Sequence, residues 1–433
     1  MISEKIKSSI NGNIIIPGDK SISHRSIIIP SIANGVTEIK NILESEDVIH
    51  TLEALKSLGV KIIKENKKVI IFGRGLNSLI EPKKDIFLGN SGTSARLLTG
   101  LLASQSFNST LKGDKSLSSR PMERIMTPLR KMGAEFDNLS GKLPLKIIGK
   151  KLKESKIIID IPSAQIKSGL ILAALNTEGR SILIEKNITR NHTELMLDAF
   201  GADIDINKKN NETKITIIGK KELKSQNIQV PSDLSSSAFF IIAALINTGS
   251  KIFLKNININ PSRNGILIAL NKMGANIEIK NKRNLVGEII ADLEVEHSEL
   301  KGCELNKDMS KLMIDEYPIL SIAAAFAKGP SIFRGLGELR VKESDRLELI
   351  KINLNKCGCD CRIINNDDLV INPSNSYSPV NNSIRTDYDH RIAMSFAIMG
   401  SKIGNLSINE SDSIDTSFPN FKDLFNSSGG NIL

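Results

Sequence analysis

Short polar segments that mix cations, hydroxyls and carboxylates recur along this chain. GDKSISHR at 18–25 places Lys20, Ser21 and Arg25 at the start of an apolar stretch, and LRVKESDRL at 339–347 sets carboxylates among cations. Arginine and lysine in such numbers bind anionic groups, and arginine pairs with carboxylate or phosphate through two parallel hydrogen bonds. The segments therefore predict a site that binds small anions.

The same composition returns at further segments. The candidate residues are Lys20, Ser21, Arg25, Asn90, Gly92, Thr93, Arg96, Arg120, Ser163, Gln165, Lys167, Asp315, Glu316, Arg340, Lys342, Glu343, Asp345, Arg346, Asp389, His390 and Arg391. A charge run is also typical of a solvated helix face, and residues 340–346 alone fit that interpretation equally well. Because the pattern recurs at the same structural place, we favour one shared site between two domains.

Two familiar binding devices are excluded. A Walker loop needs Gly-x4-Gly-Lys-Ser/Thr, but Asp19 separates Gly18 from Lys20. Aromatic residues make up 4% of the chain and tryptophan is absent, which argues against a stacking platform for single-stranded nucleic acid. The net charge of +10 suits acidic partners of either kind, nucleic acid or small anions.

The apolar runs of the chain are short. The N-terminus offers only residues 14–16 as a continuous apolar run, less than a signal peptide needs, and FFIIAALI at 239–246 falls below the ~18 residues of a membrane span. We expect a soluble, cytoplasmic protein. With 433 residues, the default is two domains.

Six related segments divide the chain into repeats. SLGVKII, KMGAEFD, AFGADIDI, KMGANIEI, KCGCDCRI and SSGGNIL share one pattern, and their glycines are Gly59, Gly133, Gly201, Gly274, Gly358 and Gly429. Each ends a segment of helical period and opens an alternating one, which predicts a helix C-cap followed by a half-buried strand. Cys359 and Cys361 take core positions of the fifth repeat, which we favour over a metal site because neither a C-x2-C pair nor a second ligand pair is present.

Each repeat also carries a more apolar helix, such as NSGTSARLLTGLLASQ or SDLSSSAFFIIAALINTG, opened by polar residues. Helices that are apolar all round must be buried, and their N-termini are natural anion sites. The sixth repeat stops at Leu433, so the N-terminal stretch up to Ile16 is expected to complete it. We predict a first domain at 18–230 and a second domain at 1–17 plus 231–433.

Eight motifs give the chain a full-length resemblance to a known family. It resembles the 5-enolpyruvylshikimate-3-phosphate synthases through PGDKSISHR, LGNSGTSARL, SSRPMERI, PSAQIKSGL, DEYPIL, ELRVKESDRL, DHRIAMSF and TSFPNF, in this order. The resemblance implies an α/β (α+β) protein, a two-domain inverse α/β prism of six βαβαββ repeats, three per domain. It places the active site in the cleft between the domains.

The reaction implied by the resemblance transfers the enolpyruvyl group of phosphoenolpyruvate to the 5-hydroxyl of shikimate 3-phosphate and releases phosphate. It needs a base, an acid and cations, but no metal and no organic cofactor. The catalytic residues implied are Asp315 as the base, with Lys20 and Glu343 moving protons at the methylene carbon. Sequence does not settle which residue moves which proton.

The resemblance also implies two sets of binding residues. Those for shikimate 3-phosphate are Lys20, Ser21, Arg25, Ser163, Ala164, Gln165, Arg190, Asp315 and Lys342. Those for phosphoenolpyruvate are Lys20, Asn90, Gly92, Arg120, Gln165, Arg346 and Arg391. His390 either orients the phosphate side or is a structural hydrogen bonder.

Four positions bear on how far the family pattern carries over. Thr416 and Ser417 stand where many members carry lysine before Phe-Pro, and Glu338 replaces an asparagine that contacts shikimate 3-phosphate. Gly92 keeps the small residue that accompanies glyphosate binding in sensitive members. Together they leave the response to glyphosate open.

Two other functions were weighed. The sister enolpyruvyl transferase that acts on UDP-N-acetylglucosamine usually has Lys-Asn where Lys20 and Ser21 stand, and often a cysteine in its first domain, whereas the first cysteine here is Cys303. A basic nucleic-acid binder would explain the charge but not the carboxylates at helix openings. We therefore expect small-molecule substrates, no nucleic acid or membrane partner, and a monomer.

Overall fold

The computed structural model describes residues 1–65, 68–138, 140–209, 212–374, 376–377 and 382–433. The chain forms two compact units, which we describe separately and call the N-unit and the C-unit. The N-unit consists of Gly18–Pro231 and Asn284–Glu288, and the C-unit of Met1–Pro17, Ser232–Arg283 and Ile289–Leu433. Within the described residues, no helix has both the length and the apolarity that a bilayer crossing requires.

The short segment Asn284–Glu288 groups with the N-unit by its contacts, although the sequence analysis assigned it to the second domain. The physical reason lies in two contacts of this segment. Gly287 packs closely against Leu195, since a Cβ on Gly287 would lie 3.2 Å from it, and Glu288 Oε1 is 2.7 Å from His192 Nδ1. Neither contact can be predicted from the local sequence, because Leu195 and His192 lie far away along the chain.

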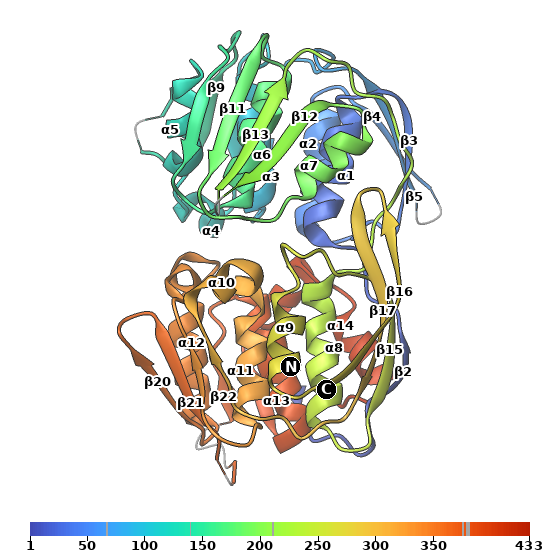
Figure 1. The fold of residues 1–433 in the computed structure, drawn as a ribbon, viewed down its shortest axis with the longest axis vertical. Coiled ribbons are helices and arrows are strands. Elements are labelled where there is room, and N and C mark those ends of the chain that lie inside the picture. The colour runs from blue at the N-terminus through green and yellow to red at the C-terminus, as the bar shows by residue number, and fades with distance from the viewer. Residues whose placement is uncertain (66–67, 139, 210–211, 375, 378–381) are drawn as a thin grey trace. The chain divides into compact units, whose positions relative to one another are not determined.

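The described part of the N-unit contains three four-stranded sheets (Figure 1). In the order of their strands they are β14 (Ile228–Gln229), β3 (Asn34–Lys40), β5 (Lys68–Arg74) and β4 (Lys61–Glu65); β6 (Ile86–Phe87), β7 (Ser109–Lys112), β9 (Leu145–Ile148) and β8 (Glu135–Asp137); and β10 (Lys156–Ile159), β11 (Arg180–Glu185), β13 (Glu212–Ile218) and β12 (Asp203–Lys209).

The described part of the C-unit contains two four-stranded sheets and one three-stranded sheet. They are β2 (Asn11–Ile14), β15 (Lys251–Asn258), β17 (Glu288–Glu296) and β16 (Asn276–Leu285); β18 (Glu304–Leu305), β19 (Ser331–Phe333), β21 (Asp368–Asn372) and β20 (Asp360–Ile364); and β22 (Ser383–Ile384), β23 (Leu406–Ile408) and β1 (Ile2–Ser3). The N-terminal stretch thus supplies two strands. As predicted, β1 completes the sixth repeat, whereas β2 joins the sheet of the fourth.

In the described chain, every sheet begins with one parallel pair, between a short outer strand and the strand that follows the buried helix. Two of these outer strands come from outside their repeat. β14 follows the third repeat but pairs with β3 of the first, and β2 precedes all repeats but pairs with β15 of the fourth. Each unit thus has one strand that returns to its other end: β14, after the third repeat, joins the first, and β1, before the fourth, joins the sixth.

Buried helices and amphipathic helices alternate along the chain. The buried ones are α1 (Lys20–Ser31), α3 (Gly92–Ala103), α6 (Ala164–Leu175), α8 (Leu234–Ile246), α11 (Tyr317–Ala325) and α13 (His390–Ile403). The amphipathic ones are α2 (Glu46–Ser57), α5 (Glu123–Lys131), α7 (His192–Ala199), α9 (Gly265–Lys272), α12 (Arg346–Lys356) and α14 (Phe421–Ser427). Short helical segments are α4 (Lys115–Ser119), α10 (Lys307–Met313), η1 (Ile314–Glu316), η2 (Gly337–Val341) and η3 (Ser411–Thr416).

The repeat glycines confirm the predicted C-caps. Each of the six follows an amphipathic helix and has a positive φ, between 77° at Gly201 and 107° at Gly429. A residue with a Cβ is strained in this left-handed conformation, which is why glycine ends these helices. Cys357, Cys359 and Cys361 lie in the hydrophobic core of the C-unit, as the repeat comparison predicted.

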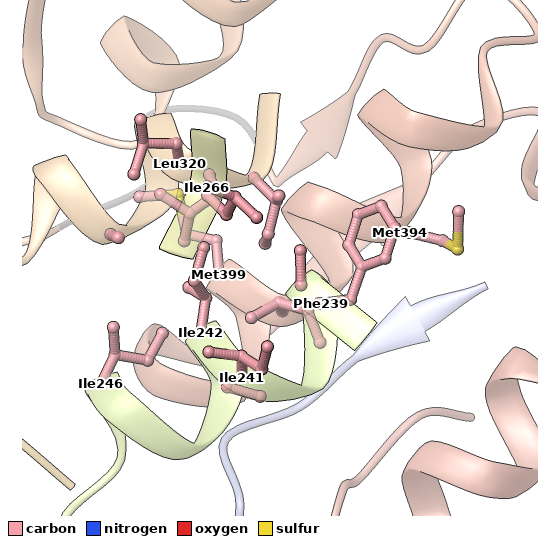
Figure 2. Packing of buried hydrophobic residues seen from close by; sticks show 14 of the residues in the cluster. Phe239, Ile241, Ile242, Ile246, Ile266, Leu320, Met394 and Met399 are labelled. Carbon is pink, nitrogen blue, oxygen red and sulfur yellow. The ribbon is translucent and has the colours of Figure 1, made fainter. Parts of the chain in front are cut away.

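Tight helix packing holds the interior of each unit. In the N-unit, α3 and α6 cross so closely at Gly100 and Gly169 that a Cβ on Gly100 would lie 1.9 Å from the Gly169 carbonyl oxygen. In the C-unit, Figure 2 shows Phe239 and Ile242 of α8 packed with Leu320 of α11 and Met399 of α13. These rigid helix bundles fix where the helix N-termini, and the polar residues on them, stand.

Candidate functional site

The openings of the buried helices are capped, but with different charges. Asp19, Asp233 and Asp389 accept backbone N–H groups at the starts of α1, α8 and α13, while serines do so at α3 and α6. A carboxylate cap offsets part of the positive end of a helix, so the attraction for an anion is weaker at these three openings than the sequence analysis expected. The neutral caps, Ser91 and Ser163, leave the positive ends of α3 and α6 uncancelled.

Arg120 and Asn90 lie together at the opening of α3. Arg120 Nη2 donates to Asn90 Oδ1 at 2.6 Å. Gly92, the first residue of α3, leaves room for two guanidinium groups. A Cβ at this position would lie 3.1 Å from Arg120 Nη1 and 2.9 Å from Arg96 Nη1. The predicted residues Asn90, Gly92 and Arg120 are thus brought together in the N-unit.

Gln165 links the openings of α3 and α6. Its Oε1 accepts from Arg96 Nη1 at 2.7 Å, and its Nε2 donates to Thr93 Oγ1 at 3.1 Å. Ser163 caps α6, accepting from Ile166 N, and Ala164 is the first residue of that helix. The two helix ends with neutral caps therefore meet at one hydrogen-bonded group.

Lys20 begins α1 and forms an ion pair that sequence reasoning missed. Its Nζ lies 2.5 Å from Asp47 Oδ2, on the first turn of α2, and its side chain remains 21% exposed. Asp47 fixes the direction of the ammonium group while leaving it within reach of solvent. The only signal for Asp47 in the sequence is an acidic residue in the first turn of a helix, which is too common to single it out.

Arg25 is buried within the N-unit, and its side chain is held by the protein. It donates to Thr193 Oγ1 at 2.6 Å, to Ser168 Oγ at 2.8 Å and to the Ser21 carbonyl oxygen at 2.8 Å. Burial lowers the pKa of Arg25 to about 10, against the opposing charge of Glu194. The predicted contact of Arg25 with substrate is thus joined to a structural role that orders α1, α6 and α7.

Lys167, a candidate anion binder by sequence, is buried in an ion group with Glu185 and Glu194. That candidate was wrong, because Lys167 lies one helical turn inside the opening of α6 and faces the interior of the unit. Arg190 lies half-buried just before α7. His24 of GDKSISHR is also buried, and burial together with the charge of Lys20 lowers its pKa well below the usual histidine value.

Arg346 is the centre of the C-unit cluster. This first residue of α12 is 1% exposed, and its guanidinium reaches three carboxylates: Asp389 Oδ2 at 2.8 Å, Glu343 Oε2 at 2.5 Å and Asp315 Oδ1 at 3.3 Å. Burial acts to lower the pKa of Arg346, but the charges of Asp389, Glu343 and Asp315 raise it above its ordinary value. The interpretation of 340–346 as a solvated helix face is excluded for Arg346.

Asp315 brings the predicted C-unit residues together. Its carboxylate lies 3.2 Å from Lys342 Nζ, and its backbone oxygen accepts from Arg391 Nη1 at 3.0 Å. The Asp315 side chain is 16% exposed and that of Lys342 is 25% exposed, so both remain accessible. Sequence reasoning missed Ser344, whose Oγ donates to Asp389 Oδ2 at 3.0 Å. This hydrogen bond connects the segment 340–346 to the start of α13.

Three further positions singled out in the sequence are His390, Glu338 and Thr416. His390 is buried at the start of α13, next to the Asp389 cap, and Glu338 is exposed in η2. Thr416 Oγ1 donates to the Ser413 carbonyl oxygen at 2.7 Å, so its hydroxyl serves the local turn. Among the described residues, no group of three or more histidines, cysteines or carboxylate residues is arranged to hold a metal ion.

Comparisons with known proteins cover the whole chain. Residues 5–425 match the family model of EPSP synthase (3-phosphoshikimate 1-carboxyvinyltransferase). The chain is 45% identical over 430 residues to the 3-phosphoshikimate 1-carboxyvinyltransferase of Ruthia magnifica subsp. Calyptogena magnifica, covering 99% of this chain and 98% of that one. A relative of the same name from Vesicomyosocius okutanii is 44% identical over 98% of this chain and 97% of its own.

Solved structures show the same fold. EPSP synthase from Acinetobacter baumannii superposes with a TM-score of 0.87 at 42% identity, over 99% of this chain and 98% of that one. The enolpyruvyl transferase NikO from Streptomyces tendae reaches a TM-score of 0.77 at only 13% identity, over 99% of this chain and 97% of that one. The second match concerns the fold alone, the two-domain arrangement of βαβαββ repeats that the sequence analysis predicted.

Proposed function

The chain belongs to the EPSP synthase family, and from that membership we propose how its two clusters of charged residues share the reaction. The protein is a 3-phosphoshikimate 1-carboxyvinyltransferase of aromatic amino acid biosynthesis. It transfers the enolpyruvyl group of phosphoenolpyruvate to the 5-hydroxyl of shikimate 3-phosphate and releases phosphate. The alternative acceptor, UDP-N-acetylglucosamine, is not favoured by these relatives.

The C-unit cluster is proposed to carry the acid–base chemistry. The observation that carries this assignment is Asp315, an accessible carboxylate whose position is fixed by Lys342 at 3.2 Å and Arg346 at 3.3 Å. Asp315 accepts the proton of the 5-hydroxyl as that oxygen attacks the enolpyruvyl carbon. Glu343, held by Arg346, and Lys20 of the N-unit handle the proton at the methylene carbon, which becomes a methyl group in the intermediate and loses a proton when phosphate leaves.

The N-unit cluster is proposed to bind the anionic groups. Arg120, set by Asn90 and unobstructed because position 92 is glycine, binds the carboxylate or phosphate of phosphoenolpyruvate together with Gln165. Ser163, Ala164 and Arg190 bind shikimate 3-phosphate at the opening of α6, where the neutral cap leaves the positive helix end uncancelled.

The remaining contacts combine residues of both units. Ser21, Arg25 and Lys342 complete the set proposed for shikimate 3-phosphate, while Arg346 and Arg391 complete that for phosphoenolpyruvate. Because Lys20 belongs to one unit and Asp315 to the other, we propose that both clusters engage the same pair of substrates during turnover. A monomer acting in the cytoplasm also stays a prediction, and light scattering of the purified protein checks the first part of it.

Phosphate release from phosphoenolpyruvate tests these assignments. We expect release with shikimate 3-phosphate and none with UDP-N-acetylglucosamine. Asp315→Asn and Lys20→Met are expected to lower kcat by about 10²- to 10⁴-fold, the range for a lost acid or base. Asp308→Asn is the matched control, because Asp308 pairs only with the exposed Lys311 of its own helix in the contacts described. A full rate in Asp315→Asn would refute the role of Asp315 while leaving the family reaction in place.

A further inference from the structure

A lysine and two glutamates form a closed ion group inside the N-unit. Lys167 Nζ lies 2.8 Å from Glu194 Oε1 and 3.1 Å from Glu185 Oε2, and the three side chains are only 1–2% exposed. Burial acts to lower the pKa of Lys167, but the two glutamates raise it on balance, so the ammonium stays charged. Neither the reaction nor the binding assignments above use these residues.

The ion group fastens the turn between β11 and α7. Glu185 Oε1, at the end of β11, accepts from the Thr189 backbone N at 3.0 Å and from Thr189 Oγ1 at 2.5 Å. Lys167 Nζ, from α6, donates to the Thr189 carbonyl oxygen at 3.3 Å. The backbone N–H, the carbonyl and the hydroxyl of Thr189 are thus all fixed, and the next residue is Arg190.

The same group also reaches Arg25. Glu194 lies on α7, and its charge acts on the Arg25 guanidinium against the effect of burial. The neighbouring Thr193 accepts from Arg25 Nε at 2.6 Å. Lys167 therefore joins α6, which opens with Ser163, to the turn that carries Arg190 and to the helix that orients Arg25.

Packing alone gives no reason for a charged group at this place. An apolar side chain of similar length would fill the volume of Lys167 without the cost of removing three charges from water, and buried ion groups of this kind seldom add stability. Within the described residues, Glu194 Oε2 is buried without a hydrogen-bond partner, so the arrangement is not even fully satisfied. Such a loss of stability is expected where buried charges position the residues of a functional site.

We infer that Lys167 is a positioning residue for shikimate 3-phosphate: through Glu185 and Thr189 it holds the turn that presents Arg190, and through Glu194 it supports Arg25. The inference rests on the binding role proposed above for Arg190. Lys167 itself, buried and fully engaged, does not touch the substrate.

A double-mutant cycle between Lys167→Met and Arg190→Ala tests the inference. Each single change is expected to raise the KM for shikimate 3-phosphate about ten- to hundredfold, the effect of a lost charged hydrogen bond, with the KM for phosphoenolpyruvate changed far less. If Lys167 acts through Arg190, the rise in the double variant stays well below the combined rise of the two single variants, and it exceeds that of Arg190→Ala only by the part that runs through Arg25. Fully additive effects overturn the inference. An unchanged KM in Arg190→Ala overturns the role of Arg190 as well, while phosphate release by the unaltered protein checks the reaction separately.

A milder variant covers the case in which Lys167→Met does not fold. Thr189→Val keeps the shape of the side chain and removes only the hydrogen bond to Glu185, so the KM for shikimate 3-phosphate should rise roughly two- to tenfold. Thr177→Val is the matched control, because this buried threonine at the far end of α6 loses an equivalent hydrogen bond to the Ala173 carbonyl oxygen. Equal KM values in the two valine variants overturn the inference.

Discussion

The two charged clusters use arginine in opposite ways. In the N-unit, Arg120 and Arg96 donate to the side-chain amides of Asn90 and Gln165, whereas in the C-unit Arg346 is surrounded by three carboxylates. An amide fixes the direction of a guanidinium without cancelling its charge, while carboxylates offset that charge. The first arrangement suits the capture of an anionic ligand. The second suits the exact placement of acids and bases, and it makes Arg346 a weaker phosphoenolpyruvate ligand than Arg120 in the binding proposed above.

The largest expected effect is a loss of stability when the cluster of the C-unit is disrupted. Arg346→Met leaves Asp389 buried without its cation and is expected to lower the free energy of unfolding by about 3–5 kcal/mol. Tyrosine fluorescence during urea denaturation measures this in the C-unit alone, because the chain has no tryptophan and its three tyrosines, at 317, 377 and 388, belong to that unit. Arg362→Met is the control, because Arg362 pairs with Asp360 at an exposed place on β20, and it should change little. Equal losses of unfolding free energy in Arg346→Met and in the control would contradict this expectation.

The N-unit counterpart should lose binding and keep stability. Arg120→Gln removes the proposed anion ligand, so the KM for phosphoenolpyruvate should rise about ten- to hundredfold, with little change in the urea midpoint measured by far-UV circular dichroism, which reports on both units. Arg130→Gln serves as control, because Arg130 pairs with Glu123 at an exposed place on α5. If Arg120→Gln destabilised the fold as strongly as Arg346→Met, the proposed division between the clusters would be wrong.

Acid should act on the C-unit cluster through Asp389. Burial acts to raise the pKa of Asp389, but the charge of Arg346 and its hydrogen bond bring it below the ordinary aspartate value. A lowered pKa in the folded state adds stability above the unfolded-state value of about 4, and this stability is lost as the pH falls through the folded-state value. The unfolding free energy from tyrosine fluorescence should therefore drop below about pH 4, and less steeply in Asp389→Asn. Identical slopes would rule Asp389 out as the cause.

The smallest effect concerns the room beside Arg120. Gly92→Ala should raise the KM for phosphoenolpyruvate by roughly two- to tenfold, because its Cβ would press on two guanidinium groups that can move aside. The same change at Gly100 meets the Gly169 backbone, which cannot move aside, and should cost about 1–3 kcal/mol of stability instead. A loss of thermal stability in Gly92→Ala equal to that in Gly100→Ala would show that position 92 is a packing site.

The sequence predicted the repeats well because the signals of each repeat depend only on nearby residues. The glycine of a C-cap, the all-apolar helix and the alternating strand are set by neighbours within one or two turns, and Gly59 or Gly358 can be recognised without knowing any distant contact. These signals predicted six repeats of helix and strand, and the family resemblance implied the prism fold that they build. The destination of β2 did not, because pairing with β15 depends on residues more than two hundred positions away.

Within the site, sequence predicted which residues matter better than how they are paired. Asp315, Lys342 and Arg346 do lie together, yet nothing in the pattern showed that Asp389 would hold Arg346 or that Asp47 would hold Lys20. Lys167 was misjudged for the same reason. A lysine near a helix opening has the same letter whether it faces solvent or two buried glutamates, and only the packing of α6 against its neighbours decides.

The pairing of the N-terminal strands β1 and β2 with distant repeats has a consequence for folding during translation. Met1–Pro17 is translated before the other described segments, but β1 pairs with Leu406 and Ser407, which follow about four hundred residues later. The sheets of the N-unit can close as soon as β14 is made, whereas β2 must wait for β15 and β1 must wait for β23. Such late, long-range pairing is slow, so the first seventeen residues are the part of the nascent chain most in need of protection from premature pairing.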